Sequence, residues 1–139
     1  MSTYSKLGFI SALILSLTAC QTTGSDGLSF KSGSLGAPNP NADQVFADIY
    51  KPTGRGPFPA VILLHTCGGV KPHVSYDWPN FLTKNGYVVL TIDTMGSRGY
   101  STCAGNIGSL MVQQAEDAFG GLNYLKQQPF IDGRNVAVM

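Results

Sequence analysis

Two groups of residues with chemical potential follow apolar runs in this sequence of 139 residues. The first is His65-Thr66-Cys67-Gly68-Gly69, directly after the branched aliphatic run 60–64. The second begins at Asp93 and extends to Cys103. A histidine can act as a base, a cysteine as a nucleophile, and a glycine-rich turn can present backbone N–H groups to a developing negative charge. Both groups are therefore candidate site segments.

Several chemistries can be set aside for the first group. His65, Cys67 and His73 do not form a metal site, because the spacing H-x-C-x5-H is not one that zinc sites use. Cys67 also lacks the glycine-flanked signature of a nucleophile on a strand-to-helix turn. We expect no metal and no other cofactor. His65 can be a catalytic base or a structural residue that fixes its loop, and Asp93 is interpreted as a cap of its own loop.

The apolar pattern predicts the elements that position these segments. Alternation after residue 44 indicates a half-buried strand, whereas short, continuously apolar runs are typical of strands buried on both faces. Strands are expected at 44–50, 60–64, 87–93 and 135–139, and helices at 76–86 and 109–128. Strands that alternate with helices favour an α/β fold with a mostly parallel sheet and flanking helices, which binds ligands at the carboxyl ends of its strands.

The predicted helices carry recognisable signals. Asp77 is a possible N-cap of the first helix, with Pro79 in its first turn and Gly86 as its stop. Gly120 and Gly121 weaken the second helix by up to about 1 kcal/mol each relative to alanine. We expect a close approach of this helix to the sheet to be the reason for the two glycines.

The order of these pieces resembles a known family. "PAVILLHTCGG", then "GYVVLTID" followed by "SRG", then a helix containing Asp117 and the run "GLNYLKQQPFIDGRNVAVM" look like the N-terminal half of the dienelactone hydrolase family, within the α/β-hydrolase superfamily. The resemblance covers about residues 44–139. It implies a partial α/β-hydrolase fold, truncated before the nucleophile elbow, and a carboxylic ester or lactone as the substrate of the complete enzyme.

The resemblance also implies roles for individual residues. One N–H of the oxyanion hole comes from the loop after the strand equivalent to 60–64, and the motif assigns it to Cys67, with Thr66 beside it in the oxyanion loop. Thr66 stands where many of these hydrolases carry glycine. Arg98 lies near the position of an arginine that holds a substrate carboxylate. The nucleophile, acid and histidine would follow Met139, so the chain itself is expected to be inactive. The same order favours His65 as a structural residue that fixes its loop.

Two classes of function follow from this sequence. In the first, the chain is the N-terminal part of an ester or lactone hydrolase, which explains the oxyanion-like loop. In the second, it is a non-catalytic cell-envelope lipoprotein that uses a partial hydrolase fold as a binding or structural module, which accepts 139 residues as a finished protein.

The N-terminus has the organisation of a bacterial export signal. Residues 1–19 contain a lysine, an apolar stretch too short to span a bilayer and small residues before Cys20. "LTAC" resembles a lipobox, which predicts a lipidated Cys20 and a protein anchored in the cell envelope, facing the periplasm or exterior. The alternative is an ordinary secretory signal. The segment 20–41 is interpreted as a flexible tether, and the domain as residues 42–139.

The compartment and the charge bear on the partners. Cys67 and Cys103 fall in loops at the carboxyl ends of consecutive predicted strands, and the compartment outside the cytoplasm is oxidising, so we expect a disulfide between them. Charged residues make up 12% of the chain and the formal net charge is +1, with no run of Lys or Arg. Nucleic-acid binding is therefore not expected, and the expected partners are a small ester or lactone and a lipid membrane.

Overall fold

The computed structural model describes residues 27–35, 41–103, 105 and 107–139. The elements follow in the order β1 (Leu28–Lys31), β2 (Gln44–Tyr50), β3 (Phe58–Leu63), a π-helical turn η1 (His73–Asp77), α1 (Trp78–Lys84), β4 (Val88–Asp93), a 3-10 turn η2 (Gly96–Arg98), α2 (Ile107–Lys126) and β5 (Ile131–Val138). The strands form one sheet in the order β1-β2-β4-β3-β5. The pairs β1–β2 and β2–β4 are antiparallel, and the pairs β4–β3 and β3–β5 are parallel. The predicted α/β class is confirmed, and the sheet is mixed.

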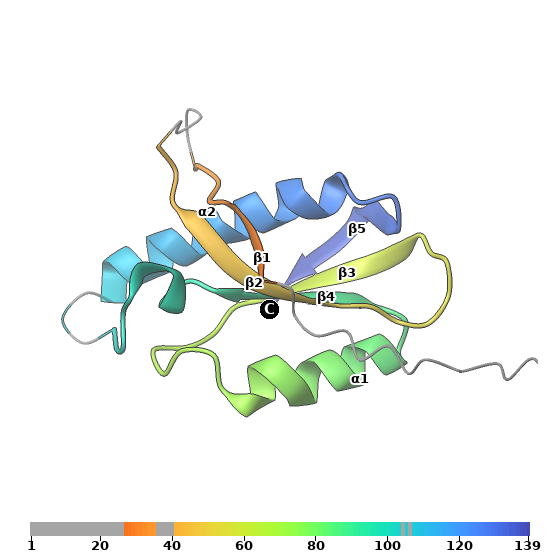
Figure 1. The fold of residues 1–139 in the computed structure, drawn as a ribbon, viewed down its shortest axis with the longest axis horizontal. Coiled ribbons are helices and arrows are strands. Elements are labelled where there is room, and N and C mark those ends of the chain that lie inside the picture. The colour runs from red at the N-terminus through yellow and green to blue at the C-terminus, as the bar shows by residue number, and fades with distance from the viewer. Residues whose placement is uncertain (1–26, 36–40, 104, 106) are drawn as a thin grey trace, which may run out of the picture.

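Helices α1 and α2 cover opposite faces of this sheet, as Figure 1 shows. The larger cluster of buried apolar residues lies between the sheet and α2 and comprises Phe30, Val45, Ala47, Ala60, Ile62, Val88, Leu90, Ile92, Ala118, Leu125 and Ile131. The smaller cluster, on the α1 side, comprises Val61, Leu63, Val74 and Val89. Because β3 and β4 contribute to both clusters, they are buried on both faces as predicted. No helix within the described ranges is long and apolar enough to cross a bilayer.

The prediction that residues 20–41 form a flexible tether is wrong for Leu28–Lys31, which form β1. The four residues of β1 pair with β2, from Leu28 opposite Ala47 to Lys31 opposite Gln44. Phe30 is 8% exposed, and its ring stacks on that of Tyr124 with centroids 5.8 Å apart. A single aromatic residue among small polar ones gave no periodic signal, because its partners lie far away in the sequence. The folded domain therefore includes residues on the N-terminal side of the predicted boundary at 42.

Two other element boundaries differ from the prediction. Asp77 has helical backbone angles and its side chain makes no capping bond, because the π-helical turn η1 runs directly into α1. β5 begins at Ile131, four residues before the predicted start at 135. Ile131 is buried and pairs with Phe58 of β3. Tertiary pairing therefore extended the strand through polar residues that alone favour a turn.

The glycine pair in α2 lies where the helix touches the sheet, which confirms the expected close approach. A Cβ atom on Gly120 would collide with the carbonyl oxygen of Lys31 and lie 2.9 Å from the Gly33 nitrogen. A Cβ atom on Gly121 would lie 2.9 Å from a methyl group of Leu90. The two glycines therefore let α2 pack against β1 and β4 at a distance that a larger residue would not allow.

Candidate functional site

The 65–69 loop leaves the carboxyl end of β3, at the sheet edge where its parallel neighbours also end. The backbone N–H of Leu64 donates to the carbonyl of Met139 at 2.8 Å, and the N–H of Met139 donates to the carbonyl of Ile62 at 2.9 Å. The residue after β5 is therefore level with the start of the loop. The loop closes with a bond from the Gly69 N–H to the Thr66 carbonyl, at 3.0 Å.

His65 anchors the loop through its ring. The side chain is buried, with Nδ1 2.8 Å from the Thr66 carbonyl oxygen and Nε2 3.3 Å from the backbone nitrogen of Met95. Because Met95 must donate its N–H, the ring accepts at Nε2 and carries its proton on Nδ1. Asp93 Oδ1 lies 3.6 Å from Nε2 but accepts a hydrogen bond from the Gly96 N–H at 2.8 Å. Asp93 thus caps its own loop, as predicted.

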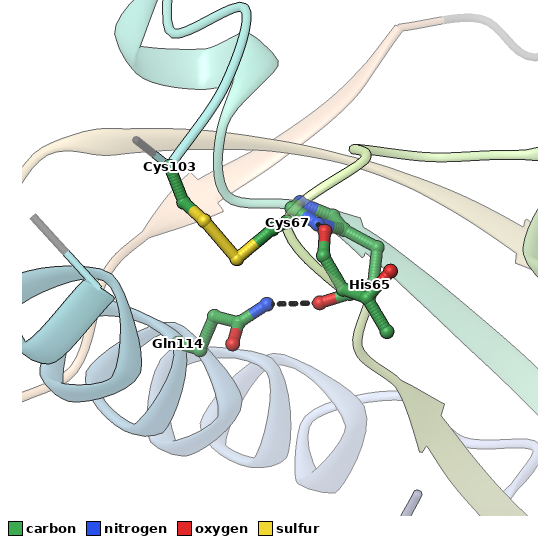
Figure 2. Close-up of a disulfide and its surroundings, with 5 residues drawn as sticks. His65, Cys67, Cys103 and Gln114 are labelled. Carbon is green, nitrogen blue, oxygen red and sulfur yellow. Dashed lines mark hydrogen bonds between the residues drawn. A yellow bond between two sulfur atoms is a disulfide. The ribbon is translucent and has the colours of Figure 1, made fainter. Parts of the chain in front are cut away.

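Two further contacts hold the loop from the segment after β4, and Figure 2 shows both. Cys67 and Cys103 form a disulfide, with their Cα atoms 5.1 Å apart. Gln114, in the second turn of α2, donates from Nε2 to the backbone carbonyl of His65. The predicted site segments after β3 and β4 are therefore brought together and covalently joined.

The backbone N–H of Cys67 is the group that the family resemblance assigned to the oxyanion hole. Among the described residues it has no hydrogen-bond acceptor, whereas the neighbouring carbonyl groups of His65 and Thr66 are used. Thr66 is exposed. An N–H group without an internal partner, held in a covalently fixed loop, can donate to an anionic oxygen of a ligand.

Arg98 occupies a different environment from the 65–69 loop. Its Nη1 and Nη2 each lie 2.9 Å from a carboxylate oxygen of Asp117, its Nε lies 2.8 Å from Asp43 Oδ2, and Nη1 also donates to the Thr94 carbonyl at 3.0 Å. Burial lowers the pKa of Arg98, but the hydrogen bonds and charges of Asp117 and Asp43 outweigh it and raise the pKa above its ordinary value. Four of its five N–H donors are therefore occupied. A role toward a substrate carboxylate stays a prediction.

Asp117 is the buried partner of this arginine. The side chain is fully buried, and it also accepts a hydrogen bond of 2.6 Å from the Ser32 hydroxyl. Because Ser32 follows β1, Arg98 ends η2 and Asp117 lies in α2, the three residues join the N-terminal strand to both elements after β4.

An apolar groove of about 400 Å³ lies beside the site, between α2 and the outer end of the sheet. It is lined by Ile62, Leu64, Met111, Gln114, Ala115, Ala118, Phe119, Leu122, Val136 and Val138. Met111 and Phe119 are exposed on its α2 side, and Val138 on its β5 side. This face of the sheet is therefore not fully covered by the described residues.

Sequence analysis missed one residue of the site, Gln114, and named one residue, Cys20, that the structure does not describe. Gln114 was missed, although its place between the buried Leu110 and Ala118 on one helix face was a signal. Cys20, the predicted lipidation site, lies outside the described residues. No group of three His, Cys, Asp or Glu side chains that could hold a metal ion occurs in the part of the chain that the structure describes.

Solved structures of similar fold include hydrolases. A putative dienelactone hydrolase from Klebsiella pneumoniae matches over 81% of this chain and 48% of its own, with 17% identity and a TM-score of 0.57. A dienelactone hydrolase-like promiscuous phosphotriesterase from metagenomic libraries matches over 83% and 48%, with 20% identity and a TM-score of 0.58. A hypothetical protein from Pseudomonas aeruginosa matches over 97% and 40%, with 18% identity and a TM-score of 0.61.

These likenesses establish the fold. At identities of 17–20% the chain shares the architecture of dienelactone hydrolase-like proteins, which is an α/β-hydrolase fold, and it spans about half or less of their length. No protein-family model matches the sequence, and no curated protein matches it. What the chain does must therefore be argued from its site.

Proposed function

We propose that this chain forms the N-terminal part of a dienelactone hydrolase-like enzyme that hydrolyses carboxylic esters or lactones. The observation that carries the proposal is the Cys67 N–H, which has no acceptor among the described residues and lies in a loop at the carboxyl end of β3. Ligands of open α/β sheets bind at this edge. The likeness to dienelactone hydrolase-like structures supports the same reading.

In the proposed reaction Cys67 binds the charge that develops on the substrate. A serine or cysteine nucleophile, deprotonated by a histidine, attacks the ester carbonyl carbon, and the C=O bond electrons move to the oxygen. The Cys67 N–H and the N–H after the nucleophile donate to that oxyanion. The carbonyl re-forms as the alkoxide leaves with the proton from the histidine, and water then releases the acid by the same steps. One such donor contributes on the order of 100-fold or more to kcat.

The proposed nucleophile follows Met139. Met139 is hydrogen-bonded to both Ile62 and Leu64, so a residue after it would begin beside the 65–69 loop, where the proposal places the nucleophile elbow. The apolar groove between α2 and β5 is suited to cover by a further helix, because Val136 and Val138 present apolar side chains there. Both features support a catalytic centre completed by later residues.

The location of the protein is part of the proposal. The lipobox-like "LTAC" supports a lipid anchor at Cys20 and a place in the cell envelope, with a secreted form as the alternative. The disulfide between Cys67 and Cys103 is compatible with an oxidising compartment.

Expression of the complete reading frame tests this function. A glycine-flanked Ser or Cys encoded just after codon 139 and hydrolysis of p-nitrophenyl acetate and of an unsaturated lactone are expected, both abolished when that nucleophile is changed to alanine. A frame that ends at Met139, with a folded chain that hydrolyses neither substrate, would instead support a non-catalytic lipoprotein module.

A further inference from the structure

We propose that Gln114 is a positioning residue for the oxyanion hole, which fixes the direction of the Cys67 N–H by holding the peptide group next to it. The inference rests on the proposed function. Its starting point is the hydrogen bond from Gln114 Nε2 to the His65 carbonyl, across 49 residues of sequence and visible in Figure 2.

The bonded carbonyl is one peptide group away from the proposed donor. The His65 carbonyl belongs to the peptide group that links residues 65 and 66, and the Cys67 N–H belongs to the next. Two soft dihedral angles, those of Thr66, separate the two planar groups. The Thr66 carbonyl, in the same peptide plane as the Cys67 N–H, is bonded to the His65 ring and to the Gly69 N–H. With both peptide groups held, the direction of the Cys67 N–H is set.

Gln114 differs from the other two anchors in what it holds. The disulfide fixes Sγ of Cys67, and the Met95 N–H fixes the ring of His65. Both of those contacts act through side chains with rotatable bonds. Among the described residues, Gln114 is the one residue outside the loop whose side chain bonds to the main chain of residues 65–67.

The helix behind Gln114 gives this contact a rigid base. Leu110 and Ala118, one turn before and one turn after, are buried against the sheet at 6% and 9% exposure. The side chain therefore extends from a helix face that cannot move without disturbing the core. Such support of a donor by a packed neighbour is what precise transition-state binding requires.

The test uses the complete chain with two substitutions that remove the donor. Gln114→Met keeps the length and volume of the side chain, and Gln114→Glu keeps its shape while replacing the amide by a carboxylate. Gln127→Met is the matched control, because Gln127 donates to the carbonyl of Asn123 four residues earlier, at 3.1 Å and on the surface. Thermal unfolding identifies a variant that does not fold, and the other substitution then carries the test.

Two readouts separate positioning from catalysis. Hydrogen exchange followed by mass spectrometry should show faster exchange of the 65–69 amides in both Gln114 variants, and wild-type rates in Gln127→Met. With p-nitrophenyl acetate, kcat should fall on the order of 10- to 100-fold in the Gln114 variants with KM nearly unchanged, because the oxyanion forms only in the transition state.

The outcomes distinguish this inference from the proposed function. Unchanged exchange of the 65–69 amides in folded Gln114 variants overturns the inference, and so does an unchanged kcat in an active enzyme. Faster exchange in the Gln114 variants, together with a wild-type enzyme that hydrolyses no ester, overturns the proposed function and leaves Gln114 as the residue that holds the loop.

Discussion

Arg98 and Asp117 form a two-pronged ion pair, in which both terminal nitrogens of the guanidinium donate to the two carboxylate oxygens at 2.9 Å. The side chain of Asp117 is fully buried and that of Arg98 is 7% exposed. Removing one partner of such a pair leaves a charge in a site that cannot solvate it. Removal of either partner alone is therefore expected to be strongly destabilising.

We predict that Asp117→Asn lowers the free energy of unfolding by about 3–5 kcal/mol. The amide keeps the shape of the carboxylate but loses the buried charge beside Arg98, whose other carboxylate partner, Asp43, is exposed. Urea denaturation followed by circular dichroism measures the change. Arg134→Ala, which removes the exposed pair with Asp132, is the control and should change nothing measurable; equal effects of the two substitutions would contradict the prediction.

Opposite signs are expected from two glycine-to-alanine substitutions in α2. Gly120→Ala should lower stability, because its Cβ would collide with the backbone of residues 31–33. Gly108→Ala should raise stability by up to about 1 kcal/mol through helix propensity, because nothing lies within 4 Å of the added Cβ. The same urea titration measures both, and a stabilising Gly120→Ala would show that α2 does not approach the sheet closely.

Cys67 and Cys103 are expected to resist alkylation in the folded protein unless a reductant is added first. Cys103→Ser should lower the free energy of unfolding by about 3–4 kcal/mol, because the disulfide closes a loop across 36 residues. Mass spectrometry of the alkylated chain and denaturation of the variant measure the two effects. Two thiols that react without reductant would exclude the disulfide.

The mature protein is predicted to begin at a lipidated Cys20. Residues 1–19 have the organisation of an export signal, and the small residues before Cys20 match a lipobox. Mass spectrometry of the mature N-terminus should find an acylated cysteine, and Cys20→Ala should move the protein from the membrane fraction to the soluble fraction. A free amine on any other residue would contradict the prediction.

The elements that sequence analysis predicted well are those whose signal is local. The apolar runs of β3 and β4 and the helical repeat of α2 each contain enough apolar residues to indicate their own structure. β1 has one buried aromatic residue, Phe30, whose partner Tyr124 lies in α2. Such an element is defined by its partners, and no local pattern indicates it.

The same distinction applies to the candidate site. The glycine pair after Cys67 marked the 65–69 loop, because a turn of this kind leaves a local trace. Gln114 and Asp117 acquire their roles through contacts with His65 and Arg98 on other elements. Arg98 was associated with substrate through the family resemblance, and nothing in the sequence around it indicates its contact with the buried Asp117.

The three residues outside the 65–69 loop that hold it all come after it in the sequence. Met95 lies 30 positions after His65, Cys103 lies 36 positions after Cys67, and Gln114 lies 49 positions after His65. A chain that leaves the ribosome, or crosses a membrane, with its N-terminus first has therefore delivered all three anchors before residue 115 emerges. The disulfide can close, and the loop can take its shape, while β5 is still being synthesised or translocated.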